Sequence, residues 1–255
     1  MPGLRRRQTR PSLRLLDDGV VRARLRPWPE QPDVAHLVLT DHTMAPRSTT
    51  LRDWMEVAAD DEYSALRTGA LSLDAARTFV DHGFVEIQRL ALLRRQLSAD
   101  TFVAEPHHRT RPLRGTRAFE TAARIDRKAF ESGWDLDAAG IRDACQATPN
   151  HRVRLALTSS DEPAGYMITG RNGSAGFVQR LAVDPRHEGH GVATSLILDG
   201  LAWLQRSGVD DVLINTRLDN SRALDLYRRL GFDDMDETLV VLERRIDAGS
   251  LPWKG

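Results

Sequence analysis

The stretch from Leu181 to Ile197, LAVDPRHEGHGVATSLI, constrains the fold more than any other part of the chain. A short apolar run ends at an Asp-Pro pair, and two glycines then lead directly into a helical pattern. Proline ends a strand because it cannot donate to the hydrogen-bond ladder. Glycine allows backbone conformations that other residues resist, and it lets a ligand approach the main chain. The stretch therefore predicts a strand, a loop and then a helix.

A loop of this kind has the chemistry of an anion site. The amides in the first turn of a helix lack intrahelical partners, and the helix dipole adds a partial positive charge. We therefore expect the segment from Gly189 to Thr194 to form a seat for phosphate or diphosphate. A tight strand-to-helix turn without a ligand explains the glycine spacing equally well, because a Gly-x-Gly pair alone is a weak signal.

The pattern around this loop predicts a mixed α/β domain. Strands are predicted at residues 152–157, 164–170, 176–183, 211–216 and 238–246, and helices at 116–130, 136–148, 192–207 and 220–230. The last helix ends at Gly231, a good C-cap. In the N-terminal part, extended segments are predicted at residues 20–28, 34–40 and 84–97, and helices at 51–61 and 72–82.

An internal repeat links the two parts of the chain. The segment RTGALSLDAARTFVDHGF, residues 67–84, aligns without gaps to NTRLDNSRALDLYRRLGF, residues 215–232. Thr68, Ala75, Gly83 and Phe84 are identical to their counterparts, and each copy reads as strand, helix, Gly-Phe, strand. Chance can produce so few identities, but the shared element order favours a duplication.

Two motifs together resemble the GNAT family of acyl-CoA N-acyltransferases over about residues 101–247. The diphosphate signature of that family, Arg/Gln-x-x-Gly-x-Gly/Ala, falls on Glu188, Gly189, His190, Gly191, Val192 and Ala193. The second motif, a helix with an Asn, an Ala and a Tyr that ends in Gly-Phe, falls on Asn220, Ala223, Tyr227, Gly231 and Phe232.

The resemblance implies an α/β fold with a mixed, splayed sheet flanked by helices, and acetyl-CoA as co-substrate without a metal. It implies that the backbone of Leu181, Ala182 and Val183 contacts the pantetheine arm of the cofactor. It also implies that the residues from Glu188 through Thr194 hold the diphosphate. Asn220 would contact the cofactor arm, and Tyr227 would be the general acid that protonates the leaving thiolate. A plain N-cap and a core aromatic are the structural alternatives for Asn220 and Tyr227.

The chain departs from the family pattern at two places. Glu188 stands where Arg or Gln is usual, and a carboxylate beside a diphosphate is unfavourable. The strand before the loop offers Gln179, where many relatives place a Glu. Glu131, between the first two helices of the domain, is a candidate base or acceptor contact, and a solvated loop charge is the alternative.

The repeat and the resemblance suggest a domain organisation. We expect a disordered basic tail at residues 1–10, a degenerate, shortened GNAT-like domain at 11–100, a catalytic GNAT domain at 101–247 and a C-terminal tail at 248–255. The segment DHTMAPRSTT, residues 41–50, is the counterpart of the anion loop and contains no glycine. We expect the N-terminal half to have no counterpart of the two helices on the acceptor side and not to bind CoA well.

Composition excludes several classes of protein. The 255 residues are 41% hydrophobic, which is enough for a packed core. No apolar run approaches the roughly 20 residues that a membrane span needs, and a formal net charge of zero gives no indication of nucleic acid as a partner. The single cysteine, Cys145, fits a reducing compartment, so we expect a cytoplasmic protein.

The sequence thus predicts an N-acetyltransferase that moves an acetyl group from acetyl-CoA to a primary amine by direct attack. The acceptor would be the N-terminus of a protein or peptide, or a small metabolite. The alternative is a non-catalytic CoA-binding or scaffold protein with a decayed site, which Glu188 and the missing strand carboxylate favour.

Overall fold

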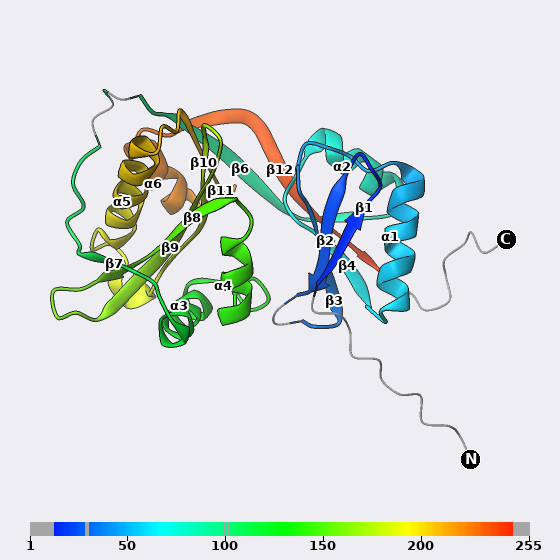
Figure 1. The fold of residues 1–255 in the computed structure, drawn as a ribbon, viewed down its shortest axis with the longest axis horizontal. Coiled ribbons are helices and arrows are strands. Elements are labelled where there is room, and N and C mark those ends of the chain that lie inside the picture. Colours follow the sequence, from blue (N-terminus) through cyan, green and yellow to red (C-terminus); the bar gives the residue numbers. More distant parts are fainter. Residues whose placement is uncertain (1–12, 29–30, 99, 101–102, 247–255) are drawn as a thin grey trace, which may run out of the picture. The chain divides into compact units, whose positions relative to one another are not determined.

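The computed structural model describes residues 13–28, 31–98, 100 and 103–246 (Figure 1). The described chain forms two compact units. The first contains the residues up to Arg89 and those from Leu239 onward, and the second contains Leu90–Thr238. The tails expected at 1–10 and 248–255 lie outside the described residues.

The second unit is a mixed sheet with helices on both faces (Figure 1). Its strands are β7 (Thr110–Pro112), β8 (Asn150–Leu157), β9 (Pro163–Asn172), β10 (Ala175–Val183), β11 (Asp211–Arg217) and the part of β6 (Val85–Gln96) that begins at Leu90. Its helices are α3 (Thr116–Ala129), α4 (Ala138–Cys145), the short 3-10 helix η1 (Pro185–His187), α5 (Val192–Arg206) and α6 (Ser221–Arg229). The order of strands and helices agrees with the pattern predicted from the sequence.

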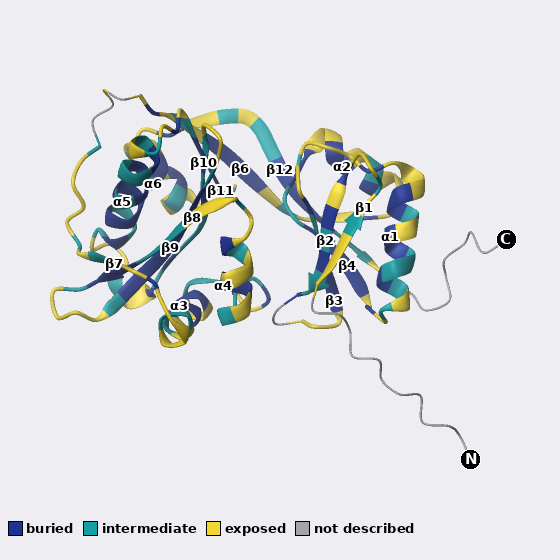
Figure 2. Ribbon diagram, in the orientation of Figure 1, coloured by how far each residue is buried: buried dark blue, intermediate teal, exposed yellow. Residues whose placement is uncertain are grey.

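Strand alternation builds two cores in this unit, one on each face of the sheet. On β9, Tyr166 and Ile168 point into the core under α3 and α4, whereas Met167 between them points into the core under α5 and α6. Cys145 is buried in the first of these cores, and burial raises the pKa of its thiol to about 11, which makes it a packing residue. Figure 2 shows buried residues along the strands and exposed residues in the connecting loops.

The sheet of the second unit splays between β10 and β11. These strands pair in parallel only from Ala175 opposite Asp211 to Val178 opposite Ile214. A bulge follows between Val178 and Arg180, after which β10 continues on β9 alone as far as Val183. Within the described residues, no strand pairs with the other side of β10 beyond Val178. We call residues 180–183 the open edge of β10.

The first unit has a smaller sheet with its core under two helices. It contains β1 (Arg14–Asp17), β2 (Arg22–Pro27), β3 (Val34–Leu39), α1 (Ser48–Asp60), β4 (Ala65–Thr68), β5 (Leu71–Ser72), α2 (Leu73–Asp81) and the part of β12 (Asp233–Arg245) that begins at Leu239. As in the second unit, antiparallel strands are followed by one parallel pair, here β3 with β4. The described part of this unit has no counterpart of α3 and α4 before its first strand.

The sequence repeat corresponds to a structural repeat. Ser72 and Asn220 cap α2 and α6 by accepting hydrogen bonds from the amides of Ala75 (3.2 Å) and Ala223 (3.1 Å). Both helices end at a glycine with positive φ, 78° at Gly83 and 76° at Gly231. An arginine also donates a hydrogen bond at the C-terminal end of each helix. Nη1 of Arg244 donates to the carbonyl of His82 after α2, and Nη1 of Arg95 donates to the carbonyl of Leu230 after α6.

Each of the two strands that follow the repeated helices is divided between the two compact units. β6 follows α2, but its residues from Leu90 pair with β11 of the second unit. β12 follows α6, but its residues from Leu239 pair with β4 and β5 of the first unit. The compact units are not consecutive stretches of sequence, because β6 and β12 each continue from one unit into the other. The division into domains at 11–100 and 101–247 stays a prediction.

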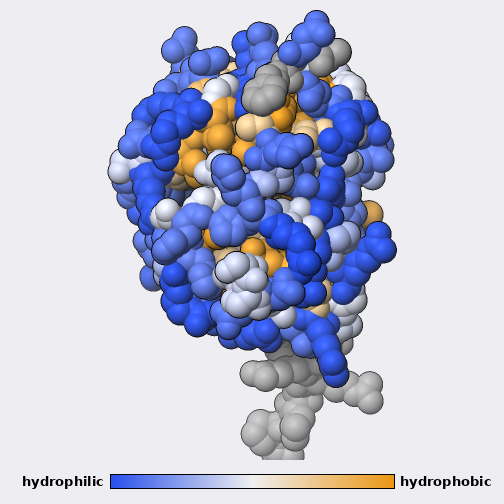
Figure 3. All heavy atoms as spheres, turned by 90° about the vertical axis from the view of Figure 1, so that its left-hand side faces the viewer, coloured by the Kyte–Doolittle hydropathy of each residue, from blue (hydrophilic) through white to orange (hydrophobic). Residues whose placement is uncertain are grey.

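The face drawn in Figure 3 is mostly polar. Figure 3 shows one face on which hydrophilic residues predominate and hydrophobic residues appear in two smaller areas. No helix in the described ranges is long and apolar enough to span a bilayer.

Candidate functional site

The loop between β10 and α5 begins at a buried carboxylate. Asp184 accepts hydrogen bonds from Nζ of Lys128 (2.8 Å) and from the amide (3.1 Å), Nε (3.2 Å) and Nη2 (3.0 Å) of Arg186. The bonds from Arg186, followed by the one from Lys128, lower the pKa of Asp184 well below its ordinary value. Asp184 therefore stays charged and ties the start of the loop to α3.

The two glycines of the loop adopt the conformation that their motif predicts. Gly189 has φ 78° and Gly191 has φ 79°, in the left-handed region, and Gly191 is the N-cap of α5. A Cβ atom added at Gly191 would meet nothing within 4 Å, so this residue faces open space. The glycine is needed for backbone geometry and leaves room beside the main chain.

Six consecutive amides at the start of α5 are free. No described residue accepts a hydrogen bond from the backbone N–H groups of residues 189–194, whereas Ser195 donates to Gly191 (2.9 Å) and begins the helical ladder. Glu188, Gly189 and His190 are exposed, and Gly191, Ala193 and Thr194 are half-buried. Val192 is buried. The donors predicted for an anion site are thus not bonded to any described residue, and most of them belong to residues that are exposed or half-buried.

His108 supports this loop from a distant part of the chain. Its Nε2 lies 2.7 Å from the carbonyl oxygen of His190, and its amide donates to Oγ of Ser195 (3.0 Å). No local pattern in the sequence links His108 to His190, because His190 lies 82 residues further along the chain. Within the described ranges, no three His, Cys, Asp or Glu residues are grouped so that they could hold a metal ion.

The open edge of β10 lies immediately before the loop. Ala182 points into the core under α3 and α4, and Leu181 and Val183 pack partly against the core under α5 and α6. Gly165 on β9 makes this close packing possible, because a Cβ atom there would lie 2.8 Å from the carbonyl oxygen of Ala182. Gln179 lies beside the bulge and donates to Thr148 (3.3 Å); it is not a carboxylate.

Tyr227 lies on the buried face of α6 and packs against Phe232 at 6.1 Å between ring centroids. Its side chain is buried, and this desolvation raises the pKa of its phenol to about 12. In the described part of the chain its hydroxyl has no hydrogen-bond partner. The hydroxyl is also not among the fully enclosed polar atoms that lack a partner. The phenol is therefore protonated at neutral pH and has a proton to donate.

Asn220 uses both ends of its side-chain amide within the protein. Oδ1 accepts from the amide of Ala223, and Nδ2 lies 3.3 Å from Oγ1 of Thr216 on β11. The capping alternative that the sequence left open is therefore present in the structure. Its contact with a cofactor arm stays a prediction.

Glu188 does not stand alone beside the free amides. Its Oε2 forms an ion pair with Nη1 of Arg222, the second residue of α6. Arg222 also lies next to the loop backbone, since its Nη2 is 4.0 Å from the position of a Cβ atom added at Gly189. The sequence showed the unusual carboxylate but not the guanidinium that faces it.

Glu131, the candidate base, lies just after α3 with its side chain 71% exposed. Nη1 of Arg217 donates to its Oε1 (2.8 Å), and Nη2 of Arg217 donates to Asp219 (2.5 Å). Hydrogen bonds from Arg217 to Asp219 and then to Glu131 raise the pKa of the guanidinium. Glu131 thus lies in a surface ion pair at the end of β11, and its contact with an acceptor stays a prediction.

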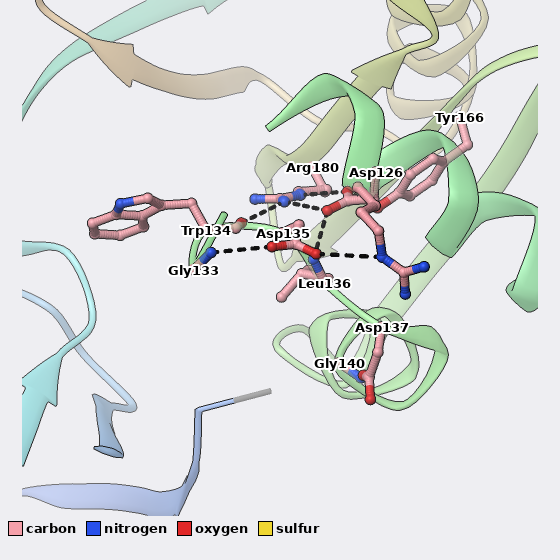
Figure 4. Close-up of polar contacts among 10 residues, drawn as sticks. Asp126, Gly133, Trp134, Asp135, Leu136, Asp137, Gly140, Tyr166 and Arg180 are labelled. Carbon is pink, nitrogen blue, oxygen red and sulfur yellow. Dashed lines mark hydrogen bonds and ion pairs between the residues drawn. The ribbon is translucent and has the colours of Figure 1, made fainter. Parts of the chain in front are cut away.

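A buried ion pair fixes the segment between α3 and α4 (Figure 4). Asp126 is fully buried and accepts from Nε (2.9 Å) and Nη2 (2.5 Å) of Arg180, from the Tyr166 hydroxyl (2.5 Å) and from the Leu136 amide (2.6 Å). Arg180 also donates to the carbonyl of Trp134 (2.8 Å). Because Arg180 is on the open edge of β10, this network holds the 130–137 segment against that edge.

The chain is similar to known acetyltransferases in sequence and in fold. Residues 119–232 match the sequence model of the acetyltransferase (GNAT) family. N-alpha-acetyltransferase 30 of Saccharomyces cerevisiae is 37% identical over 90 residues, which are 35% of this chain and 48% of that protein. Mycothiol acetyltransferase of Actinosynnema mirum is 39% identical over 119 residues, 44% of this chain and 40% of that protein. The matches thus cover less than half of either relative.

Solved structures agree with the fold. A tandem GNAT protein from the clavulanic acid biosynthesis pathway superimposes with a TM-score of 0.64 at 17% identity, over 95% of this chain and 86% of that one. A GCN5-related N-acetyltransferase from Sphaerobacter thermophilus gives a TM-score of 0.59 at 16% identity, over 89% and 76%. The family match and the splayed mixed sheet together support a GNAT acyl-CoA N-acyltransferase fold for the second unit.

Proposed function

We propose that the second unit binds acetyl-CoA and transfers its acetyl group to a primary amine. The observation that carries the proposal is the run of six free amides at residues 189–194, directly after the open edge of β10. A diphosphate accepts hydrogen bonds from such amides and is stabilised by the dipole of α5. The peptide-like pantetheine arm suits an unpaired strand edge, as in strand addition.

Each predicted contact has a matching group in this arrangement. The backbone of Leu181, Ala182 and Val183 would bond to the amides of the pantetheine arm, and the amides of Gly189 to Thr194 would hold the diphosphate. Asn220 would reach the arm from the start of α6 in addition to its capping role. These contacts would put the thioester along the opening between β10 and β11.

Tyr227 is proposed to act on the leaving group. The amine nitrogen attacks the thioester carbonyl carbon, the C–S bond breaks, and the sulfur leaves with the bonding electron pair. A phenol of pKa about 12 is a weaker acid than a thiol of pKa about 8.5. Full proton transfer from Tyr227 alone would therefore cost about 5 kcal/mol. We infer that its hydroxyl donates a hydrogen bond to the departing sulfur. The proton lost by the attacking amine ends on that sulfur, so the products are the N-acetylated amine and a thiol.

The acceptor is proposed as a class. One relative is named an N-alpha-acetyltransferase and several are named mycothiol acetyltransferases, so the N-terminal amine of a protein or peptide and a small metabolite amine are both candidates. Glu131 is a proposed contact for a cationic amine, provided that the amine displaces Arg217 from it.

We propose that the first unit holds no acetyl-CoA. Its parallel strands stay paired from Val34 opposite Ala65 to Leu37 opposite Thr68, and the amide of Gly69 still donates to Leu37 (2.8 Å). Thr68 aligns with Thr216, where β10 and β11 have already separated. In the described residues, the first unit therefore has no counterpart of the opening between β10 and β11, and the loop before α1 contains no glycine.

Two measurements on the full chain test the function. Isothermal titration calorimetry with acetyl-CoA should show one site per chain. Release of free thiol from acetyl-CoA, followed with a panel of peptide N-termini and small amines, should show turnover with at least one of them. Binding without turnover across the panel would favour the non-catalytic alternative, which the absence of a carboxylate at Gln179 supports. No binding would contradict both.

A further inference from the structure

The diphosphate seat has an electrostatic problem at its first residue. Glu188 is exposed next to the free amides of residues 189–194, and a carboxylate there repels a diphosphate. The nearby cations Arg186 and Lys128 are both engaged with Asp184. A further cation beside Glu188 would offset this repulsion.

Arg222 is such a cation. It is at the start of α6, its side chain is 62% exposed, and it forms an ion pair with Glu188. Its Nη2 lies 4.0 Å from the Cβ position of Gly189, the first residue of the amide run. Exposed ion pairs of this kind are weak, so the guanidinium can exchange one anion for another at little cost.

We propose that Arg222 is the cation of the diphosphate site, in place of a side chain from position 188. This proposal rests on the proposed function. In the free protein the guanidinium neutralises Glu188 and keeps it away from the amides. When acetyl-CoA is bound, the guanidinium lies between the Glu188 carboxylate and a diphosphate oxygen and is shared by both. The positive charge of the site thus comes from α6 rather than from the loop.

The repeat provides an internal comparison. Asp74 of α2 occupies the position that corresponds to Arg222 of α6, in the alignment that pairs Ser72 with Asn220. The charge at this position is therefore reversed in the unit whose loop lacks glycine and whose strands do not splay. A cation at this position is found in the unit that has the amide run.

Calorimetry on variants of the full chain tests the proposal. We expect Arg222→Gln to weaken acetyl-CoA binding at least tenfold, Arg222→Lys to weaken it less, and Glu188→Gln to leave it unchanged or tighten it by a few fold. Arg229→Gln, which removes the same charge from the same helix, should change the dissociation constant less than twofold. An equal effect of Arg222→Gln and Arg229→Gln would overturn the proposal, because only the net charge would then matter.

A second ligand locates the contact. The loss caused by Arg222→Gln should be the same with 3′-dephospho-CoA, which keeps the diphosphate, and should vanish with S-acetylpantetheine, which has none. A loss seen with acetyl-CoA but not with 3′-dephospho-CoA would assign Arg222 to the 3′-phosphate and overturn the diphosphate contact. Failure of the unaltered protein to bind acetyl-CoA would refute the proposed function, whereas tight binding that is insensitive to Arg222 would refute this inference alone.

Discussion

Tyr227 of α6 and Phe79 of α2 occupy the same position in the two copies of the repeated helix. Each ring packs against the phenylalanine after the helix-ending glycine, Tyr227 against Phe232 at 6.1 Å and Phe79 against Phe84 at 5.3 Å. Both rings pack against the equivalent phenylalanine, and the two residues differ only in the hydroxyl of Tyr227. Only the copy beside the free amides carries a proton donor, so the hydroxyl is not needed for the packing itself.

Tyr227→Phe should therefore separate chemistry from binding. We expect kcat to fall by about 10² while the dissociation constant for acetyl-CoA stays within twofold, since the ring remains and only the donor is lost. Tyr63→Phe, which removes the hydroxyl of a buried tyrosine from the first unit, is the control and should leave kcat unchanged. Equal rates for Tyr227→Phe and the unaltered protein would remove Tyr227 from the mechanism.

The pH dependence follows from the raised pKa of Tyr227. Because desolvation raises its pKa to about 12, the phenol stays protonated through the neutral and mildly alkaline range. We expect no loss of kcat from this group between about pH 7 and pH 10. An alkaline decline in that window that disappears in Tyr227→Phe would show that the phenol ionises earlier and contradict the assignment.

Gly191→Ala should weaken acetyl-CoA binding by at least tenfold. The new methyl group would stand in the space in front of the amide run, and φ of 79° is unfavourable for alanine. Gly173→Ala is a matched control, because Gly173 also has positive φ and nothing within 4 Å of an added Cβ atom, but lies in the turn between β9 and β10. Both variants should lose about 1 kcal/mol of stability, and only Gly191→Ala should lose affinity in calorimetry.

Asp184 should make the protein acid-sensitive. Its pKa is lower in the folded protein than in the unfolded chain, so its stabilising effect is complete above the unfolded value near 4 and declines as pH falls toward the folded value. We expect Asp184→Asn to lower the free energy of unfolding at pH 7 by about 1 kcal/mol, because both of its cationic partners are largely exposed. Urea unfolding from pH 7 to pH 3 should show the difference shrinking with acidity; a constant difference would argue against an ionised Asp184.

Removing only one partner of the Asp126–Arg180 ion pair should strongly lower the free energy of unfolding. Arg180→Met leaves the buried Asp126 carboxylate without its cation, and we expect a loss of about 3–5 kcal/mol in urea unfolding. The double variant Asp126→Asn with Arg180→Met removes both charges and should recover part of that loss. A double variant that is no more stable than Arg180→Met would indicate that hydrogen bonding to Tyr166 and Leu136, rather than charge, carries the contribution of this network.

The sequence by itself determined the elements whose causes are local. Asp184-Pro185 ends β10, Gly189 and Gly191 take positive φ, and α5 begins at Val192, all of which follow from residues a few positions apart. The repeat likewise indicated two helices that end in Gly-Phe, because capping depends on neighbouring residues. The anion loop and the order of strands and helices were therefore predictable.

Only the tertiary structure decided which distant groups meet. Arg222 pairs with Glu188 and Arg180 with Asp126, and the latter parts of β6 and β12 join the unit that is not their own in sequence. Such contacts depend on strand register and on which helix face packs inward, and neither is encoded in a short stretch of residues. The sequence thus specified the loop for which we propose an anion, and the packing of the chain determined which side chains surround that loop.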